Sequence, residues 1–226
     1  MQRRNLVVAI DGPSGSGKST VARGVALALG LRYLDTGAMY RAVTWLALHR
    51  GIALDAGDSL AALASSARVE VDADPNAPMI AIEGTDVTTA VRDPEVTAAV
   101  SAVSAVPGVR QAMVRRQREL IGDGGIVVEG RDIGTTVVPE AAVKIFLIAD
   151  ATARARRRAA QDIGLGHAES SVTATEAELA RRDTADSTRV ASPLTQAPDA
   201  VVVDSTALDA DRVIQQVVGL AEAAAS

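Results

Sequence analysis

The sequence contains no cysteine, which excludes disulfide bonds, thiolate nucleophiles and cysteine-ligated metals. It has only two histidines, His49 and His167, so neither a histidine-rich metal site nor a catalytic triad with a histidine base is expected. Aromatic residues are 2% of the chain, which argues against stacking on single-stranded nucleic acid as the main activity. The core must therefore be built mainly from Val, Ala, Leu and Ile.

Long apolar runs and an excess of positive charge are also missing. No segment approaches the roughly 20 apolar residues that span a membrane, and the first apolar run, Leu6–Ile10, ends at Asp11 and is too short for a secretory signal. We therefore expect a cytoplasmic protein with no membrane partner. The 23 basic and 28 acidic side chains give a net charge of −5, so no overall basic field exists for a nucleic-acid polymer. An anionic ligand must be held by a local cluster.

Aliphatic runs alternate with helix-like segments along the 226 residues, of which 48% are hydrophobic. Continuous aliphatic runs are typical of strands buried on both faces of a parallel sheet. The pattern predicts an α/β fold with a doubly wound, five-stranded parallel sheet. The expected strands are Leu6–Ile10, Leu31–Leu34, Gly125–Glu129, Val143–Ile148 and Ala200–Asp204, and the first helices are Ser19–Leu29, ended by Gly30, and Ala38–Leu48, ended by Gly51.

Two stretches interrupt the alternation. Val69–Val71 and Met79–Ile82 flank an Asp-Pro-Asn turn and predict a small antiparallel hairpin, which helices at Pro94–Val106 and Pro107–Ile121 follow. An arginine-rich helix, a glycine-containing turn and a second charged helix from Thr173 predict a mobile flap between about Ala151 and Ala191. We expect one domain, residues 1–226, with a core (1–36, 122–150 and 192–226), an insertion (37–121) and a flap (151–191). No heptad pattern predicts an oligomer, so we expect a monomer.

A glycine-rich motif lies between the first strand and the first helix. Residues 12–19, Gly-Pro-Ser-Gly-Ser-Gly-Lys-Ser, satisfy the pattern G-x-x-x-x-G-K-[ST] in the context that its mechanism requires. Glycines let successive backbone N–H groups turn inward around phosphate oxygens, and the following helix adds its positive end. Lys18 is expected to bridge the β- and γ-phosphates of a nucleoside triphosphate, and the Ser19 hydroxyl to ligate Mg²⁺. An accidental Gly/Ser turn is the rival interpretation.

The motif alone does not separate a kinase from a switch or a motor. The guanine-reading pattern Asn-Lys-x-Asp occurs nowhere in the chain, which argues against a GTPase. Asp35-Thr36-Gly37 after the second strand could suggest an aspartic protease, but that chemistry needs a second carboxylate and an all-β chain. The alternative is that Thr36 lies at or near a helix N-cap, and that Arg41 faces an anion across from the phosphate loop. A solvated Arg41 is the simpler possibility.

Four stretches together resemble bacterial cytidylate kinase: residues 10–19, residues 34–41, Glu129-Gly130-Arg131-Asp132-Ile133-Gly134-Thr135, and Val203-Asp204-Ser205-Thr206. The resemblance runs from about Leu6 to the C-terminal helix. It implies a P-loop kinase that uses ATP and Mg²⁺ to phosphorylate CMP and dCMP, with the insertion binding the monophosphate and the flap acting as a lid. Another small kinase, acting on UMP or AMP, and a nucleotide-dependent switch are the alternatives. One departure is Glu129, where some members are expected to carry aspartate.

The resemblance also implies which residues form the site. Cytosine presents an amino donor and two acceptors, so a carboxylate and a strong donor can read it, and Asp132 and Arg110 suit these roles. Without the resemblance, Ser101 would be a tolerated small residue and Arg110 a surface charge. The implied ATP-binding residues are Gly12, Pro13, Ser14, Gly15, Ser16, Gly17, Lys18, Ser19 and Thr20, and the implied CMP-binding residues are Thr36, Tyr40, Arg41, Ser101, Arg110, Arg131, Asp132, Arg182, Asp186 and Arg189.

The implied catalytic residues are Lys18, Arg131, Arg154, Arg157 and Arg158, and Asp35 can act on the metal through water. On a helix, residues 154, 157 and 158 share a face while 156 points away, so these three could close over the transferred phosphoryl group. The residues alone equally allow a solvated charge run. Residues 182, 186 and 189 also share a helical face, and this Arg-Asp-Arg stripe could bind a sugar phosphate or neutralise itself.

Overall fold

The computed structural model describes residues 5–164, 166 and 171–225, and His167 lies outside them. A parallel sheet forms the core of the fold, with the strand order β2-β6-β1-β7-β8. Its strands are β1 (Val7–Asp11), β2 (Arg32–Asp35), β6 (Ile126–Gly130), β7 (Val143–Ile148) and β8 (Val201–Asp204). The predicted five-stranded sheet is confirmed, and each strand lies within a residue or two of its expected place.

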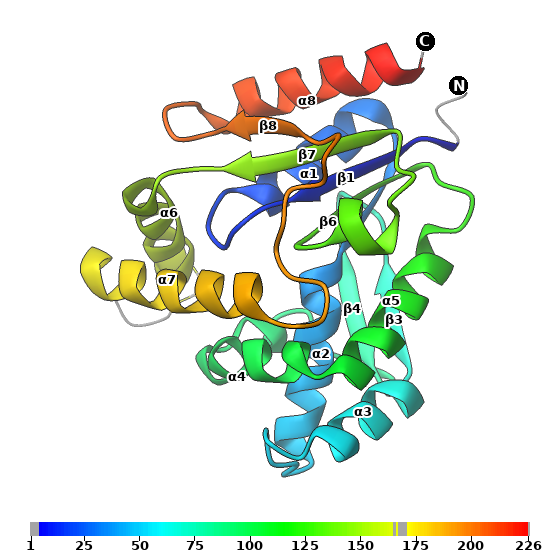
Figure 1. The fold of residues 1–226 in the computed structure, drawn as a ribbon, viewed down its shortest axis with the longest axis vertical. Coiled ribbons are helices and arrows are strands. Elements are labelled where there is room, and N and C mark those ends of the chain that lie inside the picture. The colour runs from blue at the N-terminus through cyan, green and yellow to red at the C-terminus, as the bar shows by residue number, and fades with distance from the viewer. Residues whose placement is uncertain (1–4, 165, 167–170, 226) are drawn as a thin grey trace.

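The central strand β1 is apolar on both faces because both faces are covered. Val8 and Ile10 pack in the cluster formed with α1 (Lys18–Leu29) and α8 (Ala210–Ala225), whereas Val7 and Ala9 pack in the cluster that includes α2 (Thr36–His49). Successive side chains of a strand point to opposite faces, so one aliphatic run serves both clusters. Figure 1 shows α8 lying along the sheet on the side opposite α2.

The insertion between α2 and β6 builds a second, smaller sheet. The predicted hairpin is confirmed, with Val69 opposite Ile82, and α4 and α5 match the two expected helices. The helix α3 and the third strand, β5, were not predicted from the sequence. In chain order the elements are α3 (Gly57–Ser66), β3 (Val69–Asp72), β4 (Met79–Ile82), β5 (Thr85–Asp86), η2 (Ala90–Arg92), α4 (Pro94–Ala105) and α5 (Pro107–Ile121).

The flap predicted between β7 and β8 contains two helices, α6 (Ala151–Gly164) and α7 (Val172–Thr188), which lie against each other in Figure 1. Between β6 and β7 the chain forms only a short helical turn, η3 (Ile133–Val137). Arg131, which directly follows the carboxyl end of β6, pairs with Asp186 of α7 at 2.9 Å, so this end of the sheet faces the flap. This end of a parallel sheet is where ligands bind in open α/β folds.

The phosphate loop is pressed against the sheet. A Cβ atom on Gly12, whose φ is +151°, would lie 2.1 Å from the backbone oxygen of Leu147 on β7. Only glycine fits so close to another backbone. The loop then ends at Gly17, which has a φ of 93° and is the N-cap of α1, so the first backbone N–H groups of the helix point into the loop.

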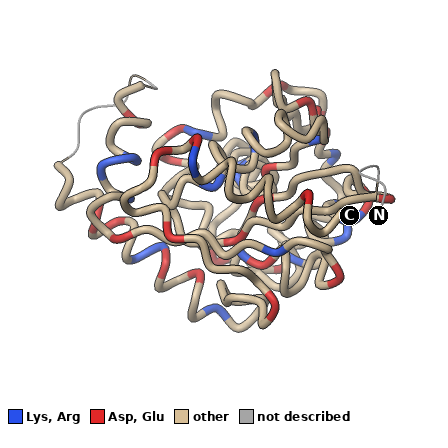
Figure 2. Tube along the Cα trace, turned by 90° about the horizontal axis from the view of Figure 1, so that it is seen from above, with Lys and Arg blue, Asp and Glu red and all other residues tan. Residues whose placement is uncertain are grey.

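Basic and acidic residues are interspersed along the trace in Figure 2 rather than segregated onto two sides. Within the described ranges, none of the helices combines the length and the apolar character that crossing a membrane requires.

A close contact between α3 and α5 gives a test of this packing. A Cβ on Gly108 would lie 2.4 Å from the Cβ of Ala61, whereas one on Gly219 would meet nothing within 4 Å. We expect Gly108→Ala to lower the free energy of unfolding by about 1–3 kcal/mol, because the added methyl forces the two helices apart. Gly219→Ala is the control and should raise it by about 0.5–1 kcal/mol through helix propensity. Urea unfolding measures both, and stabilisation by Gly108→Ala would contradict the packing.

Candidate active site

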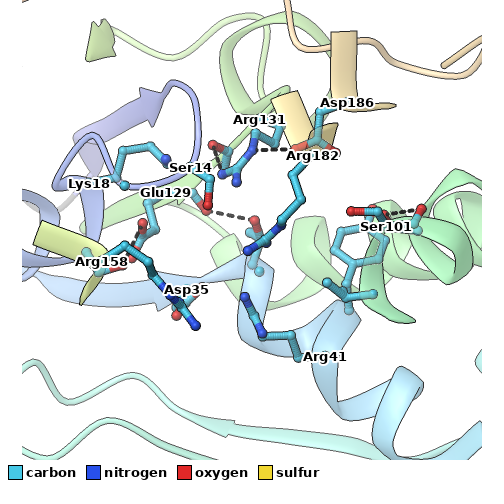
Figure 3. Close-up of a pocket in the computed structure, with 18 of the residues that line it drawn as sticks. Ser14, Lys18, Asp35, Arg41, Ser101, Glu129, Arg131, Arg158, Arg182 and Asp186 are labelled. Atoms are coloured by element: carbon cyan, nitrogen blue, oxygen red, sulfur yellow. Dashed lines mark hydrogen bonds and ion pairs between the residues drawn. The ribbon is translucent and has the colours of Figure 1, made fainter. Parts of the chain in front are cut away.

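A cavity of about 380 Å³ lies between the phosphate loop, the insertion and the two flap helices (Figure 3). Its lining carries nine cationic side chains and four acidic ones, although the whole chain has a net charge of −5. Such a local excess of positive charge suits a ligand with several negative charges. The cations are Lys18, Arg41, Arg92, Arg110, Arg131, Arg157, Arg158, Arg182 and Arg189, and the acids are Asp35, Glu129, Asp132 and Asp186.

The phosphate loop forms one end of the cavity. Lys18 is buried, and its Nζ donates to the Pro13 carbonyl at 2.7 Å. Burial lowers the pKa of Lys18, and the positive charge of Arg131 lowers it further. Of the implied ATP-binding residues, the cavity is lined by Ser14, Gly15, Gly17, Lys18, Ser19 and Thr20, whereas Gly12, Pro13 and Ser16 are not part of its lining.

The side chains of Ser19, Tyr33 and Glu129 meet beside the loop. The Ser19 hydroxyl donates to Glu129 Oε2 at 3.1 Å, and Tyr33 donates to the other carboxylate oxygen at 2.5 Å. Burial raises the pKa of Glu129. Asp35 lies directly beside Glu129 in the sheet register. Hydroxyl and carboxylate oxygens are the ligands that Mg²⁺ prefers, and Mg²⁺ commonly uses one or two of them together with substrate phosphates.

Asp35 also explains how α2 begins. Its Oδ1 accepts from the Ala38 N–H at 2.9 Å, so Asp35 is the N-cap and Thr36 is the first helical residue. Thr36 instead donates its hydroxyl to the Glu129 carbonyl at 2.7 Å. The other Asp35 oxygen pairs with Arg92 at 3.0 Å. In the described ranges no group of three or more histidines, cysteines or carboxylates could hold a metal ion without further ligands.

A buried ion pair marks the opposite end of the cavity. Arg110 Nη2 lies 2.5 Å from Asp132 Oδ2, and the two residues are only 3% and 4% exposed. The Arg110 guanidinium lies over the Tyr40 ring, 5.3 Å from its centroid, which is within range of a cation–π interaction. Arg189 approaches the second Asp132 oxygen at 3.6 Å. Arg110 is therefore not a surface charge, and a strong donor and a carboxylate are held side by side.

Arginines occupy the middle of the cavity. Arg41 on α2 donates to the Thr97 hydroxyl at 2.8 Å, and burial lowers its pKa to about 9, so it stays charged at neutral pH. Arg131 pairs with Asp186 at 2.9 Å. Arg182 projects into the same space in Figure 3, and its buried Nε and Nη1 atoms have no hydrogen-bond partner among the described residues. A guanidinium left unpaired in this way is poised for an anionic ligand.

The stripe on α7 is only partly self-neutralising. Asp186 lies 3.5 Å from Arg189 but pairs more closely with Arg131 from another segment.

All ten residues implied for CMP binding line the cavity, including Thr36, Tyr40 and Ser101. The structure therefore brings together side chains from α2, α4, α5, the end of β6 and α7.

The flap arginines share one face of α6, as predicted, and Arg156 is exposed on the other. Arg157 donates to the Ser205 hydroxyl at 2.9 Å, and Arg158 pairs with Asp162 at 2.9 Å. Both line the cavity, but Arg154 does not; it donates instead to the Ser14 carbonyl at 3.1 Å and pairs with Asp183. Their partners rule out a freely solvated charge run.

Three residues that the sequence analysis did not select contribute to the site. Asp11 accepts from the N–H groups of Ile133 and Gly134, at 2.9 and 2.8 Å, and burial raises its pKa to about 6. The signal for Asp11 was present, since a carboxylate at the end of a buried strand needs partners. Arg92 and Asp183 carried no comparable pattern, because each sits among other charged and polar residues.

The family described as Cytidylate kinase has a sequence model that matches residues 8–223. The chain is 53% identical over 211 residues to the "Cytidylate kinase" of Mycobacterium avium (strain 104), covering 93% of this chain and 92% of that protein. It is 50% identical over 219 residues to the "Cytidylate kinase" of Streptomyces avermitilis, covering 96% and 93%.

Among solved structures, a gluconokinase from Sinorhizobium meliloti 1021 superposes with a TM-score of 0.50, covering 99% of this chain and 95% of that one. At 16% identity this likeness concerns the fold alone. The two cytidylate kinases of higher identity match over 93% and 96% of this chain. The chain belongs to the cytidylate kinase family.

Proposed function

We propose that this chain transfers the γ-phosphoryl group of ATP to CMP or dCMP and releases ADP with CDP or dCDP. The observation that carries the proposal is one cavity with a phosphate loop at one end and the buried Arg110–Asp132 pair at the other. The arginines between them lie where the phosphates of two nucleotides would meet. Family membership supports the same substrates, since the relatives named above are called cytidylate kinases.

The buried pair accounts for the choice of base. Cytosine carries an amino donor at position 4 and acceptors at position 3 and O2, so Asp132 can accept from the amino group while Arg110 donates to the ring. Uracil reverses the pattern at positions 3 and 4 and leaves Asp132 opposite an oxygen. Because both side chains are buried, a mismatched base strands polar groups without water, which gives strong discrimination.

The transfer itself needs positioning and positive charge rather than a covalent intermediate. An oxygen of the CMP phosphate forms the new bond to the γ-phosphorus as the bond to the β-bridging oxygen breaks, and ADP leaves with that electron pair. Arg41, Arg131 and Arg182 hold the acceptor phosphate, while Lys18, Arg157 and Arg158 neutralise charge on the moving group. Magnesium, when bound beside Ser19 and Asp35, supplies further charge neutralisation on the donor phosphates.

We assign the parts of the chain accordingly. Residues 37–121 form the monophosphate-binding insertion and residues 151–191 the lid, within a single kinase domain that acts as a monomer. Closure of both over the cavity excludes water, which would otherwise accept the phosphoryl group. Asp186 holds the ribose hydroxyls, and Arg154 acts from the lid through the phosphate loop that it contacts.

A substrate panel tests the proposal. With magnesium and ATP, we expect the chain to phosphorylate CMP and dCMP far faster than UMP or AMP, measured as ADP release and confirmed by detection of CDP. Transfer to UMP or AMP in preference to CMP would contradict the proposal that CMP is the phosphoryl acceptor. Slow ATP hydrolysis with no preference for any acceptor would instead indicate a nucleotide-dependent switch.

Arg110→Met tests the base-reading role. We expect the KM for CMP to rise about 100-fold, because the methionine cannot donate to the base and leaves the buried Asp132 Oδ2 without its partner. The dissociation constant for ATP, measured by calorimetry, should change less than about threefold. Arg115→Met, at an exposed position of the same helix, is the matched control. Equal losses of CMP and ATP binding would contradict the assignment.

Asp132→Asn tests the polarity of the carboxylate. The asparagine amide can donate to the O4 oxygen of uracil, so we expect the ratio of kcat/KM for CMP to that for UMP to fall by at least about tenfold. Part of that fall should come from a gain with UMP. A uniform loss with both substrates would show that Asp132 supports the fold without reading the base.

A further inference from the structure

One carboxylate to which the proposed reaction gives no role contacts the phosphate loop directly. Asp183 on α7 accepts from the backbone N–H of Ser14 at 3.1 Å, across 169 residues of sequence. The same side chain pairs with Arg154 of α6, and Arg154 donates to the Ser14 carbonyl at 3.1 Å. Both backbone polar groups of one loop residue are thus bonded to an ion pair from the lid. The Asp183 and Arg154 side chains are only 19% and 12% exposed.

The Asp183–Ser14 contact has the same chemistry as phosphate binding, because in both an anionic oxygen accepts from a backbone N–H group of the loop. A phosphate loop binds anions through inward-facing backbone N–H groups and the adjacent lysine. Asp183 offers an anionic oxygen to the backbone N–H of Ser14, a residue of this loop that lines the cavity. Burial lowers the pKa of Lys18, and the negative charge of Asp183 is among the charges that offset part of this lowering. Asp183 also acts on the Arg131 guanidinium, although burial and Asp186 affect the pKa of Arg131 more strongly. The carboxylate therefore lies within the electrostatic field that is expected to receive donor phosphates.

The placement of Asp183 on α7 links this contact to the acceptor side. Asp186 lies three residues later, on the same helical face, and pairs with Arg131 at 2.9 Å. One face of the helix therefore presents two carboxylates, one to the phosphate loop and one to an arginine assigned to the acceptor phosphate. A donor phosphate at the loop would meet Asp183 already bonded to the Ser14 N–H, and an acceptor phosphate would meet Asp186 already paired with Arg131.

We propose that Asp183 is an affinity-setting residue of the donor site, which competes with the phosphates of ATP for the Ser14 N–H. To use that N–H, a donor phosphate displaces the carboxylate. Displacement leaves Asp183 bonded only to Arg154 and loosens the tie between α7 and the loop. The inference rests on the proposed function in one respect, since it requires the loop to bind a nucleoside triphosphate.

A purely structural role for Asp183 predicts the opposite change in ATP affinity when the carboxylate is removed. If the contact only supports the loop, its removal disorders the loop and weakens ATP binding. If it competes, its removal frees the N–H, removes a negative charge from the approach of the phosphates, and strengthens binding. Since charge-assisted hydrogen bonds to carboxylates are among the stronger ones in proteins, the gain should be easy to measure.

The experiment compares Asp183→Asn with Glu176→Gln in calorimetric titrations with magnesium-ATP and with inorganic tripolyphosphate. Glu176 lies two turns earlier on α7 and is partly buried, so its variant loses the same charge from the same helix. We expect Asp183→Asn to bind both probes about tenfold more tightly, and Glu176→Gln to stay within about twofold of the unaltered chain. The asparagine amide oxygen can still accept from the Ser14 N–H, although without the negative charge. Asp183→Ser, whose neutral side chain is shorter, should free the N–H and show at least the same gain, and it serves if the asparagine variant folds poorly.

Equal or weaker binding by the Asp183 variants, with ordinary ATP binding by the unaltered chain, would overturn the inference alone. A gain of the same size in Glu176→Gln would also overturn it, because it would reflect net charge rather than the Ser14 contact. Failure of the unaltered chain to bind ATP would overturn the proposed function and the inference with it.

Discussion

The fold has to keep nine positive side chains around one cavity in a chain whose net charge is negative. Like charges at this density repel one another, and burial adds a desolvation cost, which is why the pKa values of Arg41 and Arg182 are lowered to about 9 and about 10. Four carboxylates in the lining offset part of the excess. Phosphate groups are suited to offset the rest, so the same constraint that limits the stability of the site makes it a receptor for two nucleotides.

The carboxylates that offset this charge come from different segments, and they hold those segments in register. Asp186 of the lid pairs with Arg131 at the end of β6, Asp35 of β2 pairs with Arg92 of the insertion, and Asp132 pairs with Arg110. Each pair joins two segments that are far apart in the sequence. In the closure that we propose, a substrate phosphate that binds one of these arginines changes a contact between two of these segments.

Much of the fold could be predicted because it depends on local patterns. Aliphatic runs such as Leu6–Ile10 predicted the parallel strands. Gly30 predicted the end of a helix, because glycine readily adopts the left-handed conformation that the structure shows at this position. The helix α3 and strand β5 were missed because α3 is rich in small residues and β5 is only two residues long. Helix α2 was expected to be capped near Thr36, whereas the capping side chain is that of Asp35, one residue earlier.

The site residues likewise fall into those that a local motif predicts and those that only tertiary packing brings together. Motifs continuous in sequence, such as residues 12–19, located the phosphate loop directly. The lone residues Ser101, Arg110 and Asp186 entered only through the family resemblance, because their meeting depends on how the insertion and lid pack. Arg92 and Asp183 escaped both routes, because Arg92 pairs with Asp35, 57 residues away, Asp183 contacts Ser14, 169 residues away, and no local pattern encodes such contacts. Asp11 lay within the recognised stretch 10–19, but its contact with Ile133, 122 residues away, was not predicted.

The central claim is that the cavity holds both nucleotides at once, with their phosphates sharing one set of cations. Calorimetric binding of cytidine and adenosine joined 5′ to 5′ by five phosphates tests it most directly. The account predicts that this molecule binds at least about 100-fold more tightly than ATP or CMP alone, and more tightly than its uridine counterpart, because the linkage makes the second binding event intramolecular. Affinity no greater than that of ATP, or equal for the two bases, would contradict it.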